Sequence, residues 1–188
     1  MGHQGLLLAA GAGTRMGKPK ALVRDPDGTS WLRRTVGVLE RGGCEVVTVV
    51  LGAGAQDAAS LLEGTGVATV VAEDWAEGMG ASLRAGLRSL AGSDAVAAVV
   101  MLVDLPDVSA EVVRQVAARV TGPDQLARAT YAGRPGHPVV IGRDHWAGVA
   151  DSVSGDQGAR DYLGSHGVVD VECGDLATGR DRDSPPRK

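Results

Sequence analysis

The chain has 188 residues, 44% of them hydrophobic, and this length suits one domain that buries a core without disulfides or a structural metal. Its formal net charge of −4 argues against a nucleic-acid-binding protein and against a protein of acidic membrane surfaces, since both usually carry a basic patch on a basic total. Because Phe is absent and aromatic residues make up 3%, the predicted core consists of aliphatic side chains.

The cysteines and the first residues of the chain give information about its cellular compartment. Cys44 and Cys173 are far apart and form no CxxC pair, so they fit neither a zinc site nor a disulfide framework, and we expect reduced thiols in the core. The first residues lack the charged start and the cleavage region of a secretion signal, and no apolar segment reaches transmembrane length. These observations predict a cytoplasmic protein that does not bind membranes.

Short apolar runs and amphipathic segments alternate through the first two thirds of the chain. The apolar runs are continuous rather than alternating, as parallel strands buried on both faces should be, and they lie at residues 5–9, 45–51, 67–72 and 95–102. One-sided helices are predicted at residues 31–41, 55–62, 79–90 and 109–120. Ser109, with Glu111 in the first turn, marks the start of the last of these helices. The alternation predicts an α/β fold with a Rossmann-like, mostly parallel central sheet and helices on both faces.

After Gly122 and Pro123 the pattern changes. Residues 126–132 and 139–142 flank the sequence Gly-Arg-Pro-Gly-His, which predicts a turn and an antiparallel hairpin added to the sheet.

The last third ends the predicted domain. A short helix is expected at residues 158–166 and a last strand at 168–173, so that residues 1–178 form the domain. Residues 179–188 are charged and Pro-rich, and they are either a frayed tail or a functional segment.

A glycine-rich loop follows the first predicted strand, at residues 11–20. Ligands of open α/β sheets bind beyond the carboxyl ends of the strands, where bare backbone amides can cradle phosphate. The loop is not a dinucleotide-binding fingerprint, because Met16 stands at the third glycine position and no acidic residue ends the second strand. It is not a P-loop either, because Ala12 and Pro19 replace the first glycine and the Ser or Thr.

Three basic residues, Arg15, Lys18 and Lys20, lie within six residues of this loop. Pro19 keeps Lys18 out of helical geometry, which predicts an extended basic loop. Arg15 can bind phosphate oxygens through two parallel hydrogen bonds, and Lys20 offers a mobile point charge. A triphosphate is therefore the predicted ligand, and ordinary solvated charges on a glycine turn are the alternative.

Several short motifs follow one another in an order that resembles a known family. They are LAAG at residues 8–11, RMG at 15–17, KAL at 20–22, WAEGM at 75–79, DLP at 104–106, GHP at 136–138 and SGD at 154–156. Over nearly its whole length the chain thereby resembles the molybdenum-cofactor nucleotidyltransferases, and most closely their cytidylyltransferases. The resemblance implies transfer of a nucleoside monophosphate onto a molybdopterin-type cofactor with Mg²⁺.

The resemblance also implies a set of nucleotide contacts: Leu8, Ala9, Ala10, Gly11, Gly13, Arg15, Lys20 and Ser82. In the family, Ala at the second alanine position goes with cytidylyl transfer and Gly with guanylyl transfer, so Ala10 favours CTP over GTP. Ser82, expected in the loop before a helix, is suited either to the nucleotide or to capping that helix. Ala72 replaces the family's usual Asn and removes one polar contact.

Two carboxylates are predicted metal ligands. Asp104 ends an apolar strand, so its side chain should lie beside the phosphate loop, where Mg²⁺ prefers oxygen ligands; an ordinary loop or capping Asp is the alternative. The resemblance makes Asp104 the metal-binding aspartate, with Val103 in place of the family's glycine. Asp181 and Asp183 resemble the family's late D-x-D-T-P segment, which implies that Asp183 returns a second carboxylate to the metal.

The predicted chemistry needs no general base, because a phosphate nucleophile is already ionised at neutral pH and attacks the α-phosphorus in line. Catalysis then depends on alignment and charge neutralisation by Arg15, Lys20 and Asp104 with Mg²⁺. His137, expected in a tight turn, and Asp156 are predicted to contact the acceptor, although a structural turn histidine is equally consistent with the sequence.

Three alternatives stay open at this point. A sugar-phosphate or polyol-phosphate acceptor would use the same loop chemistry. A nucleotide-binding and cofactor-binding chaperone for a molybdoenzyme client would bind the same ligands without transfer. A dehydrogenase is the third alternative, which the missing glycine and the missing acidic residue disfavour.

Overall fold

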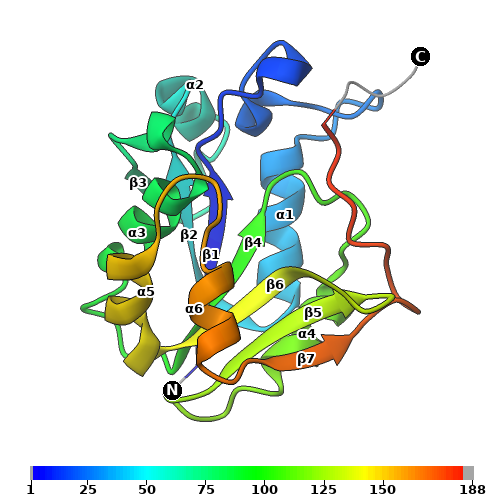
Figure 1. Cartoon of the computed structure of the whole chain (residues 1–188). Coiled ribbons are helices and arrows are strands. Elements are labelled where there is room, and N and C mark those ends of the chain that lie inside the picture. Colours follow the sequence, from blue (N-terminus) through cyan, green and yellow to red (C-terminus); the bar gives the residue numbers. More distant parts are fainter. Residues whose placement is uncertain (1, 184–188) are drawn as a thin grey trace.

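Residues 2–183 are described by the computed structural model, and they form a seven-stranded sheet with helices packed on both faces (Figure 1). The strand order is β3-β2-β1-β4-β6-β5-β7. The strands are β1 (His3–Ala9), β2 (Cys44–Leu51), β3 (Ala68–Val71), β4 (Ala97–Leu102), β5 (Leu126–Tyr131), β6 (Arg134–Gly142) and β7 (Val169–Glu172). Strand β6 runs antiparallel to β4 and β5, and the other pairs are parallel. This architecture confirms the predicted α/β fold with its antiparallel hairpin.

The register of the central strands brings their carboxyl ends to one edge of the sheet. Leu8 of β1 lies opposite Val50 of β2 and Leu102 of β4. The loop after β1 and the residues after β4 therefore start at the same level. Because these strands are parallel, the two segments meet at one edge, where a ligand site is expected.

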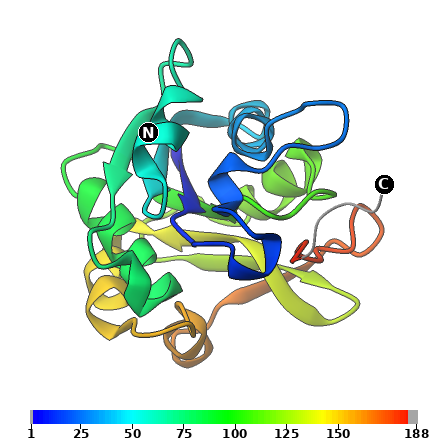
Figure 2. The same cartoon turned by 90° about the horizontal axis from the view of Figure 1, so that it is seen from above.

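The helices form one layer on each side of the sheet, as Figure 2 shows from above. One layer contains α1 (Trp31–Arg41), α2 (Ala55–Ser60) and α4 (Ala110–Ala117), and the other contains α3 (Met79–Ser89), α5 (Trp146–Ser152) and α6 (Arg160–Ser165). Successive strand residues point to opposite faces, so that Leu6 and Leu7 of β1 are both fully buried, each in a different core. None of the helices within residues 2–183 is long and apolar enough to cross a membrane.

Local sequence explains where the helices that border the site begin. Ser30 precedes α1 in an extended conformation, and its side chain accepts a hydrogen bond from the Arg33 amide. Gly78 precedes α3 with a φ of 119°, and a Cβ at this position would lie 2.5 Å from Oδ1 of Asp156. Only glycine fits there, and its presence lets the loop that carries Asp156 pack on the first turn of α3.

The hairpin differs from its prediction. Strand β6 begins at Arg134, so that most of the Gly-Arg-Pro-Gly-His sequence, His137 included, lies in a strand and not in a turn. The ladder extends because Pro135 and Arg134 pair with residues of β5, and Glu172 accepts hydrogen bonds from the Ala132 and Gly133 amides at the short turn. Proline is tolerated here because β4 pairs only with residues 139–142 of β6, which leaves one side of the β6 start without a strand.

Other elements also depart from the sequence expectations. Helix α5 was not predicted, because it has only seven residues and a short apolar stripe. The glycine-rich loop is not extended throughout, since it contains two 3₁₀ turns, Thr14–Met16 and Lys20–Leu22. Cys44 and Cys173 are buried free thiols, as predicted, and burial raises the pKa of Cys44 to about 12.

Candidate active site

A cleft of about 790 Å³ opens at the carboxyl ends of β1 and β4. Three parts of the chain form its walls: the glycine-rich loop, the start of α3 with the preceding turn, and the end of β4 with the carboxyl-terminal segment. Figure 1 shows this last segment in red, running from the end of β7 toward the loop that precedes α1. The cleft therefore joins segments from both ends of the chain.

The glycine-rich loop folds tightly and leaves amides free. Gly13 has a φ of 59°, and a Cβ there would lie 2.1 Å from the carbonyl oxygen of Lys18, so that glycine is required. At Gly11 a Cβ would meet no atom within 4 Å. No acceptor for the amides of Gly11, Ala12 and Gly13 is found among residues 2–183. Unpaired amides at the end of a strand are the feature that a phosphate group requires.

Four charged residues meet beside this loop. The ammonium nitrogen of Lys20 donates to Oδ2 of Asp104 at 2.5 Å and to Oδ1 of Asp183 at 2.6 Å, and Arg15 donates to the other oxygen of Asp183 at 3.0 Å. Burial lowers the pKa of Lys20, but the hydrogen bonds and charges of the two carboxylates outweigh it and raise this pKa overall. The hydrogen bond from Lys20 is the main reason that the pKa of Asp183 is lowered. Lys20 and Asp183 are therefore both charged at neutral pH.

The carboxylates fit a divalent cation. Oδ1 of Asp104 is buried, and it finds no hydrogen-bond partner among residues 2–183. Oxygens of Asp104, Asp181 and Asp183 lie within 4.8 Å of one another. Burying a carboxylate oxygen costs free energy unless a cation or a hydrogen-bond donor pairs with it. Hard cations such as Mg²⁺ prefer carboxylate oxygens as ligands. The structure thus adds Asp181 to the two predicted metal ligands, Asp104 and Asp183.

The carboxyl-terminal segment reaches the cleft through specific contacts. The Arg182 amide donates to the carbonyl oxygen of Asp104 at 2.9 Å, and Thr178 donates to the Asp107 carboxylate through its amide and its hydroxyl. Of the two interpretations of residues 179–188, these contacts favour an ordered segment over residues 179–183, and residues 184–188 lie outside the described part of the chain. A metal-binding role for Asp183 stays a prediction.

Most of the predicted site residues line this one cleft. They are Leu8, Ala9, Ala10, Gly11, Gly13, Arg15, Lys20, Ser82, Asp104, Asp156 and Asp183. Ser82 is buried in the first turns of α3 and not in a loop, and the residue that precedes this helix is Gly78, so that the predicted cap is wrong. The side chain of Arg15 is 81% exposed and therefore accessible to a ligand.

His137 lies in a smaller pocket of about 160 Å³ that shares Leu8, Met79 and Asp156 with the cleft. Its apolar walls come from β6, α3 and α6, and Arg128 and Arg160 contribute charge. His137 is half-buried, and burial lowers its pKa to about 4, against which the charge of Asp104 acts weakly. The imidazole is therefore neutral at pH 7.

Arg84 is a supporting residue that the sequence analysis missed. It donates to Asp74 at 2.7 Å, to Glu77 at 3.2 Å and to the carbonyl oxygen of Val153 at 3.5 Å. These bonds hold the turn before α3 and the loop of Asp156 against the same helix. No motif singles out Arg84, because its partners come from separate segments of the chain.

Comparison with known proteins gives a family match, a similar protein and similar solved structures. The family model described as the MobA-like NTP transferase domain matches residues 5–171. Nicotine blue oxidoreductase of Paenarthrobacter nicotinovorans is 37% identical over 190 residues, which cover 96% of this chain and 91% of that protein. The crystal structure of Rv0371c from Mycobacterium tuberculosis H37Rv superposes with a TM-score of 0.81 at 28% identity, over 98% of this chain and 94% of the other. The Rv0371c complex with manganese gives a TM-score of 0.75 at 27% identity, over 92% and 89% of the two chains.

Proposed function

Since the chain belongs to the MobA-like NTP transferase domain family, we propose that it transfers CMP, in preference to GMP, from the nucleoside triphosphate to the phosphate of a molybdopterin-type cofactor. Pyrophosphate is the second product. The observation that carries the proposal is the position of the Lys20 ammonium group between Asp104 and Asp183, beside a glycine loop with free amides. This arrangement supplies cationic and anionic groups for a metal-bound triphosphate. Within residues 2–183, Asp104, Asp181 and Asp183 form the one group of carboxylates that could hold a metal ion.

Each part of the cleft has a role in this reaction. The amides of residues 11–13 bind phosphate oxygens, and Arg15 and Lys20 neutralise the charge that develops on the leaving pyrophosphate. Asp104, Asp181 and Asp183 would hold Mg²⁺. When bound, Mg²⁺ would neutralise phosphate charge and orient the triphosphate for in-line attack. The acceptor phosphate is ionised at neutral pH, so the chain needs no general base.

Two parts of the site bear on the choice of nucleotide and on the choice of acceptor. Ala10, which lines the cleft at the end of β1, supports CTP over GTP through the family resemblance. The pocket of His137 and Asp156 opens beside the cleft, and its apolar walls suit the ring system of the acceptor. We expect the product to pass to a molybdoenzyme client, and residence in the cytoplasm stays a prediction.

A second candidate is a redox reaction, because the 37% identical relative is named an oxidoreductase. Met16 at the third glycine position and the three clustered carboxylates favour a metal-bound triphosphate over a dinucleotide at this loop. Two alternatives would bind a nucleoside triphosphate in the same way. They are the chaperone and a transferase that acts on a sugar phosphate or a polyol phosphate.

The test is pyrophosphate release with Mg²⁺ from CTP, GTP, ATP and UTP, each with and without purified molybdopterin cofactor. Release with CTP, and only in the presence of the acceptor, supports the proposal. Nucleotide binding without release from any triphosphate contradicts transfer to a molybdopterin-type acceptor, and it supports either another phosphorylated acceptor or the chaperone. Oxidation of NADH or NADPH by the purified protein with nicotine blue as the acceptor, in the absence of pyrophosphate release, supports the redox candidate.

A further inference from the structure

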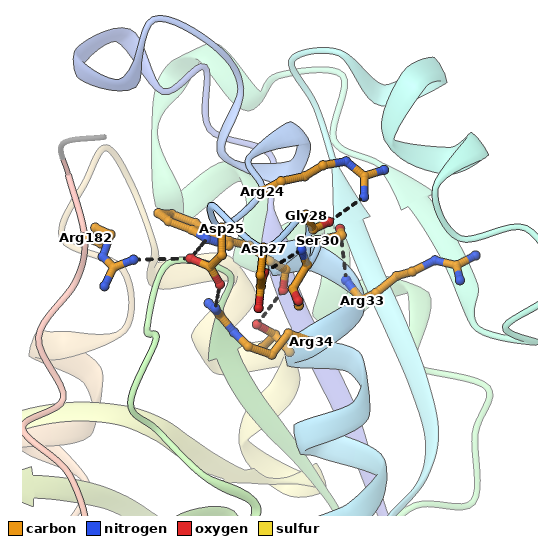
Figure 3. Close-up of polar contacts among 11 residues, drawn as sticks. Arg24, Asp25, Asp27, Gly28, Ser30, Arg33, Arg34 and Arg182 are labelled. Carbon is orange, nitrogen blue, oxygen red and sulfur yellow. Dashed lines mark hydrogen bonds and ion pairs between the residues drawn. The ribbon is translucent and has the colours of Figure 1, made fainter. Parts of the chain in front are cut away.

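A second ion-pair cluster, outside the lining of the cleft, is centred on Asp25 (Figure 3). Oδ1 of Asp25 accepts hydrogen bonds from the indole nitrogen of Trp31 at 2.9 Å and from Arg182 at 3.3 Å. Its other oxygen accepts from Arg34 at 2.5 Å. Asp25 therefore joins the loop before α1, helix α1 itself and the carboxyl-terminal segment.

The position of Asp25 is fixed by its own loop. Its amide donates to the carbonyl oxygen of Thr29 at 2.9 Å, and its carbonyl oxygen accepts from the Gly28 amide at 2.8 Å. This tight turn leads into Trp31, whose side chain is fully buried at the start of α1. Asp25 is thus attached to the hydrophobic core and can serve as a rigid anchor.

Arg182 connects this anchor with the cleft. Its guanidinium group pairs with Asp25 and lies 5.8 Å from the ring centroid of Trp31, while its backbone amide donates to the carbonyl oxygen of Asp104. Its neighbours Asp181 and Asp183 both line the cleft, whereas Arg182 does not. The side chain of Arg182 therefore ties this segment to Asp25 from outside the cleft.

We propose that Asp25 and Arg182 are positioning residues that hold Asp181 and Asp183 beside Asp104, so that the three carboxylates form one cation site. This inference rests on the proposed function, because it assigns the three carboxylates to the metal. Neither Asp25 nor Arg182 lines the cleft, so both act through Asp181 and Asp183. The Arg182 side chain is 37% exposed, and partly exposed ion pairs contribute little to global stability. Removing the Arg182 side chain should therefore loosen the segment without unfolding the domain.

The full chain with the substitution Arg182→Ala tests this proposal, with Arg180→Ala as the matched control. Arg180 lies in the same segment, and no ion pair of its side chain is found among residues 2–183. The first measurement is hydrogen exchange of the amides of residues 177–183 without metal, and the second is the affinity for Mn²⁺ with and without CTP. In Arg182→Ala we expect faster exchange, above all at the amide that donates to Asp104, and a Mn²⁺ affinity lower by about 10- to 100-fold. Arg180→Ala should change neither, and Arg182→Lys should restore part of both.

The direction of the affinity change separates positioning from charge. Removing a positive charge beside a cation site strengthens cation binding by electrostatics alone. A loss of Mn²⁺ affinity in Arg182→Ala is therefore opposite to the charge effect, whose size Arg180→Ala measures. In an Asp25→Asn background, Arg182→Ala should cause little further loss, because the two residues act through one contact.

Three outcomes overturn the proposal. They are unchanged amide exchange in Arg182→Ala, faster exchange with unchanged Mn²⁺ affinity, and additive losses in the double variant. Failure of the proposed function has a different signature, because it appears in the unsubstituted protein as the absence of pyrophosphate release or of Mn²⁺ binding. If Arg182→Ala shows faster exchange but the unsubstituted protein binds no Mn²⁺, Asp25 and Arg182 still hold the carboxyl-terminal segment in place, but they do not serve a metal site.

Discussion

The ammonium nitrogen of Lys20 lies 2.5 Å from Oδ2 of Asp104, although 84 positions separate the two residues in the chain. Lys20 therefore neutralises the carboxylate that is the predicted metal ligand. In the proposed reaction Lys20 would exchange this partner for a phosphate group, and Asp104 would be free to hold the cation. The pair keeps both side chains in place before the substrate binds.

The first prediction concerns Lys20. Lys20→Ala should lower kcat by about 10²- to 10³-fold and change the dissociation constant for CTP much less, because the lysine charge acts on the leaving pyrophosphate in the transition state. Pyrophosphate release and direct CTP binding measure the two effects. Lys18→Ala is the control, since Lys18 is an exposed residue of the same loop. Equal losses of binding and turnover would contradict a transition-state role for Lys20.

The second prediction concerns Asp104. Asp104→Asn has nearly the same shape but lacks the charge, so it should abolish metal-dependent transfer and weaken Mn²⁺ binding while the thermal midpoint stays close to that of the unsubstituted protein. Titration with Mn²⁺ and the pyrophosphate assay measure the effect. Asp94→Asn, at an exposed position outside the cleft, should behave as the parent protein does. Full activity in Asp104→Asn would remove Asp104 from the metal site.

The sequence predicts the inner strands and the position of the glycine-rich loop well, for physical reasons, although the loop is not extended throughout. Strands β1 and β4 are buried on both faces, so residues such as Leu6, Leu7, Val99 and Val100 must all be apolar, and a continuous apolar run follows. The loop after β1 is short and local, and its residues Gly13 and Gly17 have positive φ angles, which favour glycine. Such features depend on neighbours in the sequence, and they are visible without the fold.

The parts that the sequence missed depend on distant contacts. Pro135 and Gly136 are typical of a turn, but pairing with β5 draws this segment into β6. Asp25 and Arg182 are 157 positions apart, and nothing local in the sequence links them. The ion pair between them became visible only when the fold brought both ends of the chain to one edge of the sheet.

The third prediction uses the open space at Gly11. A Cβ there would meet nothing within 4 Å, so Gly11→Ala should leave the free energy of unfolding almost unchanged. The added methyl group lies at the wall of the cleft, where the proposal places phosphate oxygens, and it should weaken CTP binding by about 1–3 kcal/mol through steric exclusion. Urea unfolding and CTP binding measure the two quantities. Gly92→Ala, with equally open space outside the cleft, should affect neither, and unchanged CTP binding in Gly11→Ala would remove this part of the loop from the phosphate site.

The fourth prediction concerns pH and His137. Burial lowers the pKa of His137 to about 4, whereas an unfolded chain has a histidine pKa of about 6.5. Between these two values the unfolded state binds more protons than the folded state, so the free energy of unfolding falls as the pH is lowered from 6.5 to 4. Above pH 6.5 both states are neutral at this residue, and the contribution of His137 to the pH dependence vanishes.

His137→Gln isolates this contribution, because glutamine has a similar size and does not titrate in this range. Since His137 is half-buried and solvent screens part of the effect, we expect it to account for about 1–3 kcal/mol of the stability lost between pH 6.5 and 4. Urea unfolding of both proteins at several pH values should show a flatter acid limb for His137→Gln, with the difference confined to this window. Parallel curves for the two proteins would show that the imidazole takes up protons equally in the folded and unfolded states, and burial would then not lower the pKa of His137 in the proposed acceptor pocket.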